Sequence, residues 1–415
     1  MPKITAIEAR EILDSRGNPT VETKVEVEGG FFGVSSVPAG ASKGKYESLM
    51  LLDGDAQRFN GLGVLKAVAK VNEVIKPKLI GQEARDQLNI DKTLILLDAS
   101  ENKSNLGVNG ILSVSQAACK AAAAAEKVPV YEHVSHLYGL RKESLKIPVP
   151  IFNLINGGKH GAGNLDFQEF HVIPSSQKNY PQSLQMGEEI YQTVKKVLIR
   201  HGAIHSVGDE GGFAPNLFTN LDALEVMTEA IKESSYQFKI DVFLGLDVAA
   251  SSFYKEGMYK IRDKTTPLAT SELAEFYKDL VSQYPMAILE DPFSEDDWAG
   301  WQTISSMLPE TVIVGDDLLA TNKKRVSEAI KKKACRAILV KPNQIGTVAE
   351  TIEVVKICRD AGWKVIVSHR SGETNDDFIA DFAVGINADY TKFGAPARGE
   401  RVAKYNRLLE IGEKL

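Results

Sequence analysis

Several short apolar runs in the second half of the chain end abruptly on charged or polar side chains. Three of these runs end on acids, at Asp247, Glu290 and Asp316, and the next two end on Lys341 and His369. Carboxylate oxygens are the ligands that hard divalent cations such as Mg²⁺ prefer. A neutral lysine beside such a cation can act as a base. These residue types together indicate a metal site with a proton-transfer group next to it.

Each of these residues has a plainer interpretation when it is taken alone. A strand-end acid commonly caps the next helix or pairs with a lysine, and a lysine such as Lys341 commonly extends its charge to solvent. Three acids aimed at one mouth are harder to explain in that way. Asp291 and Asp317 directly follow two of the acids. We expect them to point elsewhere along their strands and to play supporting roles.

The spacing of the closing residues predicts a barrel of alternating strands and helices. From residue 290 onward they recur roughly every 25 residues, which is the length of one strand-loop-helix-loop unit. Such units close into a barrel whose strand C-termini share one mouth. The residues expected to face one another there are Asp247, Glu290, Asp316, Lys341 and His369.

Lys341 could serve as a base only if its side chain is uncharged. An unperturbed lysine has a pKa of about 10.4 and is protonated at neutral pH. Inside a barrel mouth, desolvation, bound cations and the nearby ammonium group of Lys392 would all favour the neutral amine. We therefore predict that Lys341 is neutral at the site.

The predicted barrel begins in an unusual way. Residues 147–155 and 167–173 have the pattern of strands, and the segment 156–164 between them is too short for a crossover helix. The pair should therefore be antiparallel. Two predicted helices, 182–200 and 220–232, follow before regular alternation starts. The predicted fold is an α/β barrel, a modified TIM barrel of order ββαα(βα)6.

The first part of the chain predicts a smaller α+β domain. Segments 4–13 and 21–27 flank a turn cluster at 14–19 and predict a hairpin. Three helical patterns follow at residues 62–75, 88–97 and 109–126. We place the N-terminal domain at 1–137, a linker at 138–146 and the catalytic barrel domain at 147–415. Predicted helix caps are Thr270, Thr347 and Thr374.

The composition limits the classes of partner. The chain has 415 residues, a net charge of −6 and a pI of about 5.8, which argues against nucleic acid or an anionic membrane as a partner. Its cysteines, Cys119, Cys335 and Cys358, lack metal-ligand spacing and indicate reduced thiols. The first residues show no apolar signal region, and no apolar run could span a bilayer. We expect a cytoplasmic protein that requires no membrane.

Six runs of the sequence resemble the enolase family, in the order in which that family carries them. The resemblance extends over nearly the full length of the chain and agrees with the domain order predicted above. It implies reversible, Mg²⁺-dependent dehydration of 2-phosphoglycerate to phosphoenolpyruvate by a homodimer or homo-octamer. The six runs are residues 14–22, 208–216, 289–293, 341–347, 368–374 and 394–398.

The resemblance implies two Mg²⁺ ions in each active site, the second arriving with the substrate. Asp247, Glu290 and Asp316 would bind the first ion. Ser42, which lies in the small-residue segment 37–44, would help to bind the second. Taken alone, that segment is either a flexible surface loop or a lid, since small residues let a backbone fold over a ligand.

The resemblance also implies the catalytic and substrate-binding residues. Lys341 would remove the proton alpha to the substrate carboxylate, and Glu210 would protonate the leaving 3-hydroxyl, with Glu169 as a second acid. Arg370 and Ser371 offer a guanidinium and a hydroxyl at a loop-helix junction, which suits a phosphate. The full substrate-binding set is Ser42, His160, Gln168, Glu169, His369, Arg370, Ser371 and Lys392.

The chain departs from the family pattern at positions that are not predicted to be catalytic. The departures are Ala39, Lys43, Met50, Leu52, Ser252 and Asn375. They leave open a paralogue that acts on a related phosphonate or carboxylated analogue. A catalytically silent binding protein is a third hypothesis, which the complete set of expected metal, acid and base positions disfavours.

Overall fold

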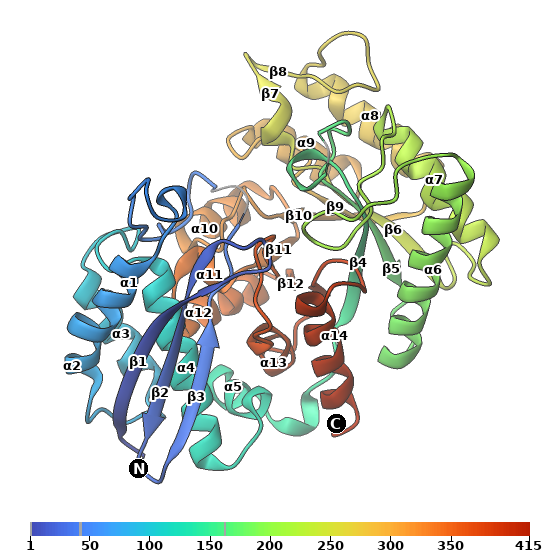
Figure 1. Ribbon diagram of the computed structural model, residues 1–415. Coiled ribbons are helices and arrows are strands. Elements are labelled where there is room, and N and C mark those ends of the chain that lie inside the picture. Colours follow the sequence, from blue (N-terminus) through green and yellow to red (C-terminus); the bar gives the residue numbers. More distant parts are fainter. Residues whose placement is uncertain (1, 41–43, 162) are drawn as a thin grey trace.

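An antiparallel sheet and a layer of helices form the N-terminal part of the chain (Figure 1). The computed structural model describes residues 2–40, 44–161 and 163–415. The sheet has the order β1-β2-β3. The predicted hairpin of the first two strands is confirmed, and a third strand that was not predicted extends it. The strands are β1 (Ile4–Leu13), β2 (Pro19–Val27) and β3 (Phe31–Ser36).

The helices of this part pack their apolar faces on the sheet. The longest, α4 (Val108–Glu126), is buried along most of its length, and its Ser113 hydroxyl lies 2.7 Å from the hydroxyl of Thr23 on β2. The helix predicted at 62–75 is divided by a π-helical stretch at Lys70–Ile75. The other helices are α1 (Leu65–Ala69), α2 (Lys76–Leu79), α3 (Gln87–Asp98) and α5 (Val130–Tyr138).

Eight strands close into a barrel in the order β10-β11-β12-β13-β4-β5-β6-β9. β5 is antiparallel to both of its neighbours, and the other pairs are parallel. The predicted barrel and its ββαα start are confirmed. The strands are β4 (Val149–Asn156), β5 (Glu169–Pro174), β6 (Val242–Asp247), β9 (Met286–Glu290), β10 (Val312–Gly315), β11 (Ala337–Val340), β12 (Lys364–Ser368) and β13 (Tyr390–Lys392).

Helices surround the barrel and bury the outer faces of its strands (Figure 1). The inner faces carry branched side chains, including Ile151, Ile288 and Leu339, which fill the interior. Burial on both faces explains why the strands are continuous apolar runs. The helices are α6 (Tyr180–Arg200), α7 (Asn220–Glu233), α8 (Thr270–Gln283), α9 (Trp298–Met307), α10 (Lys323–Lys332), α11 (Pro342–Ile345), α12 (Val348–Asp360), α13 (Phe378–Gly385) and α14 (Gly399–Gly412), and β7 (Tyr254–Lys255) pairs with β8 (Met258–Tyr259).

One of the three predicted helix caps is confirmed. The Thr347 side chain accepts a hydrogen bond from the Glu350 N–H at the start of α12. The other two predictions are wrong. Thr270 is the first residue of α8 and donates its hydroxyl to Asp297 instead. Thr374 lies before α13, whose N-cap position is Asp377. Its hydroxyl accepts the N–H of Asp376 instead, in the turn that precedes the helix.

The N-terminal part reaches the barrel mouth through residues 36–40 and 44–49, which we call the crossing segment. Its Ala39 forms two backbone hydrogen bonds of 2.8 Å with Gly372, which follows β12. A side chain at Gly372 would not fit, since a Cβ there would lie 2.3 Å from Asp14 Oδ2. We still propose the linker at 138–146, a stretch that holds a short 3-10 helix at Lys142–Ser144. Within the described residues, no helix has the length and apolar character needed to cross a membrane.

Candidate active site

Strand register brings acids from three neighbouring strands to one level of the barrel mouth. Glu169 opens β5 and is paired with Asp247, the last residue of β6. Asp247 is in turn paired with Glu290, the last residue of β9. Because β5 runs antiparallel to β6, its first residue lies at the same end as the last residues of the parallel strands. All three side chains are at most 2% exposed.

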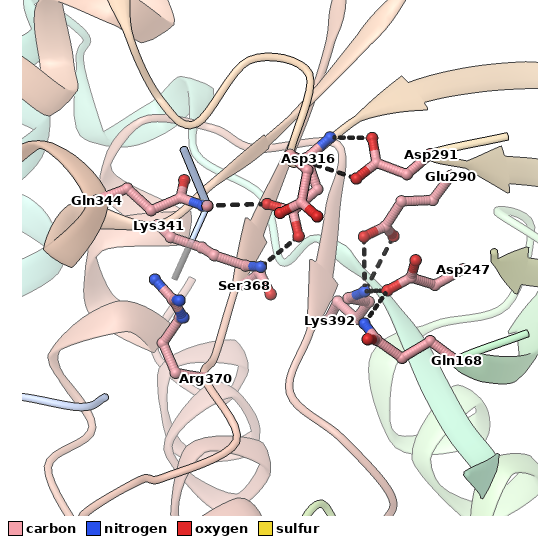
Figure 2. Close-up of polar contacts among 12 residues, drawn as sticks. Gln168, Asp247, Glu290, Asp291, Asp316, Lys341, Gln344, Ser368, Arg370 and Lys392 are labelled. Carbon is pink, nitrogen blue, oxygen red and sulfur yellow. Dashed lines mark hydrogen bonds and ion pairs between the residues drawn. The ribbon is translucent and has the colours of Figure 1, made fainter. Parts of the chain in front are cut away.

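Lys392, at the end of β13, is the common partner of these acids. Figure 2 shows its contacts with Asp247 and Glu290. Its Nζ lies 3.1 Å from Asp247 Oδ2, 2.8 Å from Glu290 Oε1 and 3.3 Å from Glu169 Oε2. Burial alone would lower the pKa of Lys392, but Asp247, Glu169 and Glu290 raise it well above its usual value. Burial and the charge of Asp247 raise the pKa of Glu290 well above its usual value. The mouth therefore holds more negative charge than one lysine offsets.

Asp316 follows β10 and pairs with Lys341, which follows β11. The Lys341 Nζ lies 2.5 Å from Asp316 Oδ2, and Gln344 Nε2 donates to Asp316 Oδ1 at 3.2 Å. The prediction that Lys341 is neutral counted the charge of bound cations as well as burial, so it stays a prediction. Burial acts to lower its pKa, but the neighbouring acids, Asp316 first and then Glu290, together raise it above its usual value. The amine can become neutral only if the Asp316 carboxylate gains another positive partner.

Asp291 and Asp317 lie beside Asp316, so the expectation that they point elsewhere along their strands is wrong, whereas their expected supporting roles stay a prediction. Asp291 accepts the N–H of Asp316 at 2.9 Å and the N–H of Asp317 at 2.7 Å. One carboxylate oxygen from each of the three acids lies within 4.8 Å of the others. Burial, with the charge of Asp316, raises the pKa of Asp317 to about 7. Asp291 adopts a positive φ of 43°, which turns its side chain back toward these N–H groups.

The three predicted metal ligands are divided between the two lysines. Figure 2 shows Asp247 and Glu290 directed toward Lys392, and Asp316 directed toward Lys341, in the same part of the mouth. Their donor atoms are all carboxylate oxygens, as a hard cation requires. A further group of close ligand atoms, His160 with Glu169 and Glu210, lies elsewhere in the pocket. The donor chemistry of the three predicted ligands therefore suits a divalent cation, with the lysines as its competitors. Among the described residues, however, only Asp316 of the three belongs to a group of ligand atoms within 4.8 Å of one another.

Glu210 lies in a tight glycine loop and faces two histidines. Its carboxylate lies 3.3 Å from His160 Nδ1 and 3.5 Å from His369 Nε2, and Asn153 Nδ2 donates to it at 3.1 Å. Gly211 allows this loop to pack closely, because it has a φ of +86° and a Cβ there would lie 2.9 Å from the Ala397 carbonyl oxygen.

His160 lies between two carboxylates. Its Nδ1 is 3.3 Å from Glu169 and 3.3 Å from Glu210, close enough for ion pairing although not aligned as a hydrogen bond. Burial would lower its pKa, but these two charges raise it to about 10. Burial likewise opposes ionisation of Glu169, yet Lys392 and the histidines hold its pKa well below its usual value. These contacts favour the charged form of Glu169 and do not support its expected role as a second acid.

His369 is oriented by Arg401, which sequence reasoning missed. An Arg401 Nη1–H donates to His369 Nδ1 at 2.6 Å, so the neutral ring carries its proton on Nε2, which faces Glu210. Burial and the charge of Arg401 hold the pKa of His369 well below its usual value. Arg401 also donates to the carbonyls of Arg370, Ser371 and Asp209, which fixes the loop that follows β12.

Replacing Arg401 by methionine should lower the free energy of unfolding by about 3 kcal/mol or more, because several buried acceptors lose their donor. The change should appear as a lower urea midpoint in circular dichroism. The matched control is Arg10→Met, since the Arg10 side chain is 74% exposed and pairs with Glu22 at the surface. That variant should lose less than about 1 kcal/mol. Equal losses in the two variants would contradict this account.

One pocket collects most of the predicted site residues. Gln168 donates to Asp247 at 3.1 Å, and Arg370 is paired with Glu47. Glu290 contacts Lys392 without lining the pocket, and Ser42 lies outside the described residues. The lining includes His160, Gln168, Glu169, Glu210, Asp247, Asp316, Lys341, His369, Arg370, Ser371 and Lys392, and also Glu47, Asp291, Asp317 and Ser368.

Family models match both parts of the chain. The model described as "Enolase, N-terminal domain" matches residues 4–134. The model described as "Enolase, C-terminal TIM barrel domain" matches residues 144–415. Together these two matches extend over nearly the whole length of the sequence.

Proposed function

Because this chain belongs to the enolase family, we propose that it catalyses the reversible, Mg²⁺-dependent dehydration of 2-phospho-D-glycerate to phosphoenolpyruvate. The observation that carries the proposal is the pocket that holds Lys341 and Glu210 together with Asp247, Asp316 and Lys392. The reaction needs a base for a weakly acidic carbon, an acid for a poor leaving group and positive charge beside a carboxylate. This pocket offers all three.

Proton removal is the task we assign to Lys341. The alpha proton of the substrate is barely acidic, because the adjacent carboxylate is already negative. Asp247, Glu290 and Asp316 would hold Mg²⁺, which when bound would stabilise the charge that develops on that carboxylate. Asp316 would then share its charge with the cation, so the Lys341 pKa would fall toward the range of a base. Lys392 would stay charged beside the same carboxylate and stabilise it.

Proton donation to the leaving 3-hydroxyl is the task we assign to Glu210. His160 and His369 both lie close to its carboxylate, and the neutral His369 presents Nε2–H toward it. Two nearby N–H groups can stabilise the carboxylate that forms when Glu210 gives up its proton. Arg370 and Ser371 would bind the phosphate, since both line the pocket on the loop that Arg401 fixes.

The direct test is to incubate the purified chain with 2-phosphoglycerate and Mg²⁺ and follow the ultraviolet absorbance of the enol double bond. We expect the absorbance to rise at a rate proportional to enzyme concentration. In a separate assay that starts from phosphoenolpyruvate, the absorbance should fall. A chain that yields no product across a range of Mg²⁺ concentrations would overturn the proposal.

Removing divalent cations should reduce turnover to background. With EDTA in excess, Asp247, Glu290 and Asp316 would be balanced only by Lys341 and Lys392, and the base would stay protonated. Adding Mg²⁺ back should restore the rate, with a saturable dependence measured by steady-state kinetics. The control is Na⁺ at matched ionic strength, which should restore nothing. Undiminished activity in EDTA would contradict the metal assignment.

The alternative of a paralogue with a related phosphonate or carboxylated substrate gains no support from the pocket. Among the described residues, none of the departures from the family pattern lines it. Lys43 and the predicted ligand Ser42 lie outside the described residues. The departures outside the pocket are Ala39, Met50, Leu52, Ser252 and Asn375.

We also propose that the protein is a homodimer, or a homo-octamer built from dimers, in the cytoplasm. The family resemblance supports the assembly, and light scattering coupled to size exclusion would measure it. The three cysteines are free and buried, which suits a reducing compartment. Thiol titration of the native and the unfolded protein would test this, with thiols expected to react only after unfolding.

A further inference from the structure

A carboxylate of the crossing segment holds the arginine that we assign to the substrate phosphate. Arg370 Nη1 donates to Glu47 Oε2 at 2.9 Å, and Nη2 donates to Glu47 Oε1 at 3.2 Å. The side chains are 6% and 9% exposed, so the pair is buried. Asn343 Oδ1 accepts a further hydrogen bond from Nη1 at 3.1 Å. Two-point contact with a carboxylate fixes the plane of a guanidinium as well as its position.

The backbone around Glu47 is anchored on both sides. The Arg325 guanidinium lies 4.1 Å from the centre of the Tyr46 ring, a cation–π contact that ties the preceding residue to α10. The N–H of Ser48 donates to the Gln344 carbonyl at 2.9 Å, which ties the following residue to α11. Glu47 is therefore a fixed part of the mouth and is not free to leave when a ligand enters.

Arg370 is also attracted by two acids of the barrel mouth. Asp316 and Asp317 both act on its guanidinium, although Glu47 acts more strongly. Without Glu47, the arginine would be drawn toward these acids and would neutralise a carboxylate that we assign to the metal. The Glu47 carboxylate holds Arg370 away from these acids. It thereby keeps the phosphate-binding arginine apart from the carboxylate assigned to the metal.

We propose that Glu47 is a positioning residue, which the N-terminal part supplies to the barrel in order to hold Arg370 for the substrate phosphate. The inference rests on the proposed function, because that function gives Arg370 its role. It makes the enzyme dependent on both parts of the chain, since the catalytic acid and base come from the barrel and the orientation of the phosphate-binding arginine comes from the crossing segment.

The test compares Glu47→Gln with the wild-type chain in two measurements. We expect the KM for 2-phosphoglycerate to rise about tenfold while kcat changes less than about threefold. The phosphate is held equally in the ground state and the transition state, so a weaker phosphate contact affects binding and not the chemical step. In isothermal titration with inorganic phosphate and Mg²⁺, the Kd should rise by about the same factor. Lys45→Gln is the matched control on the same segment, since the Lys45 side chain is 61% exposed and pairs with Asp296, and it should leave both constants unchanged.

A double variant separates positioning from a general structural role. If Glu47 acts through Arg370, then Glu47→Gln should have no further effect on KM or Kd in an Arg370→Lys background. Additive effects would overturn the proposal, and so would a lower KM in Glu47→Gln, which would mean that Glu47 competes with phosphate. Should Glu47→Gln fail to fold, Glu47→Asp keeps the charge at a shorter reach and should show a smaller rise in KM.

The two proposals can fail separately. A wild-type chain that forms no phosphoenolpyruvate but binds phosphate through Arg370 and Glu47 would overturn the function and retain the positioning role. A wild-type chain that is active, with a Glu47→Gln variant of unchanged KM and phosphate Kd, would retain the function and overturn the positioning role.

Discussion

Replacing Lys341 by alanine should reduce kcat about 10⁴-fold, the upper range for loss of a general base. The same variant should lose exchange of the substrate's alpha proton with solvent deuterium, measured by nuclear magnetic resonance. Both losses follow because the reaction begins at that carbon. Among the described pocket residues, the other lysine is Lys392, which three carboxylates hold charged.

Magnesium binding distinguishes a lost base from a lost site in the Lys341→Ala variant. Asp316 keeps its contact with Gln344 and loses only a competing ammonium. Mg²⁺ affinity measured by calorimetry should therefore be equal to or higher than that of the wild type. Lys278→Ala is the matched control, because that side chain is 55% exposed and far from any assigned role. Retained proton exchange in Lys341→Ala would assign the base elsewhere.

The barrel could be predicted because its strands are buried on both faces. Such strands leave continuous apolar runs, and each run stops where the chain reaches the polar mouth. The short connection between β4 and β5 fixed their antiparallel pairing, and that pairing places Glu169 level with Asp247. The direction of β5 could therefore be predicted from the length of one connection, whereas its register with β6 is known only from the structure.

The partners of the site residues could not be predicted in the same way. Glu47 meets Arg370 across more than three hundred positions, and Arg401 meets His369 from the last helix. Neither contact leaves a periodic or spacing signal, because it depends on how separate parts pack. Gln344 could have been found, since it lies three residues after Lys341 in a run that resembles the family.

The charge state of Lys341 is a second property that could not be predicted from the sequence. Sequence reasoning counted burial and neighbouring cations, which both favour the neutral amine. It did not count the acids beside the amine, Asp316 first, which together raise the pKa of Lys341. Asp316 is thus an expected metal ligand and the partner of the expected base. Metal binding and activation of the base are therefore linked through one carboxylate, and a cation at the site would promote both.

Replacing Glu210 by glutamine should separate the two halves of the reaction. Dehydration should fall about 10³-fold, because the amide cannot protonate the leaving hydroxyl. Exchange of the alpha proton with solvent deuterium should continue, since Lys341 and the strand-end acids are unchanged. Glutamine preserves the size of the side chain, so His160 and His369 keep a polar neighbour at that position.

The Lys341→Ala and Glu210→Gln variants, compared in one assay, should separate the base from the acid. Lys341→Ala should lose exchange and dehydration together, whereas Glu210→Gln should lose dehydration alone, because the acid acts after the carbon has given up its proton. Asp209→Asn is the matched control on the same loop and should retain both activities, since its structural contact to Arg401 is made by the backbone carbonyl. Loss of exchange in Glu210→Gln would mean that Glu210 also acts in the first step, and the division of roles proposed for the pocket would then be wrong.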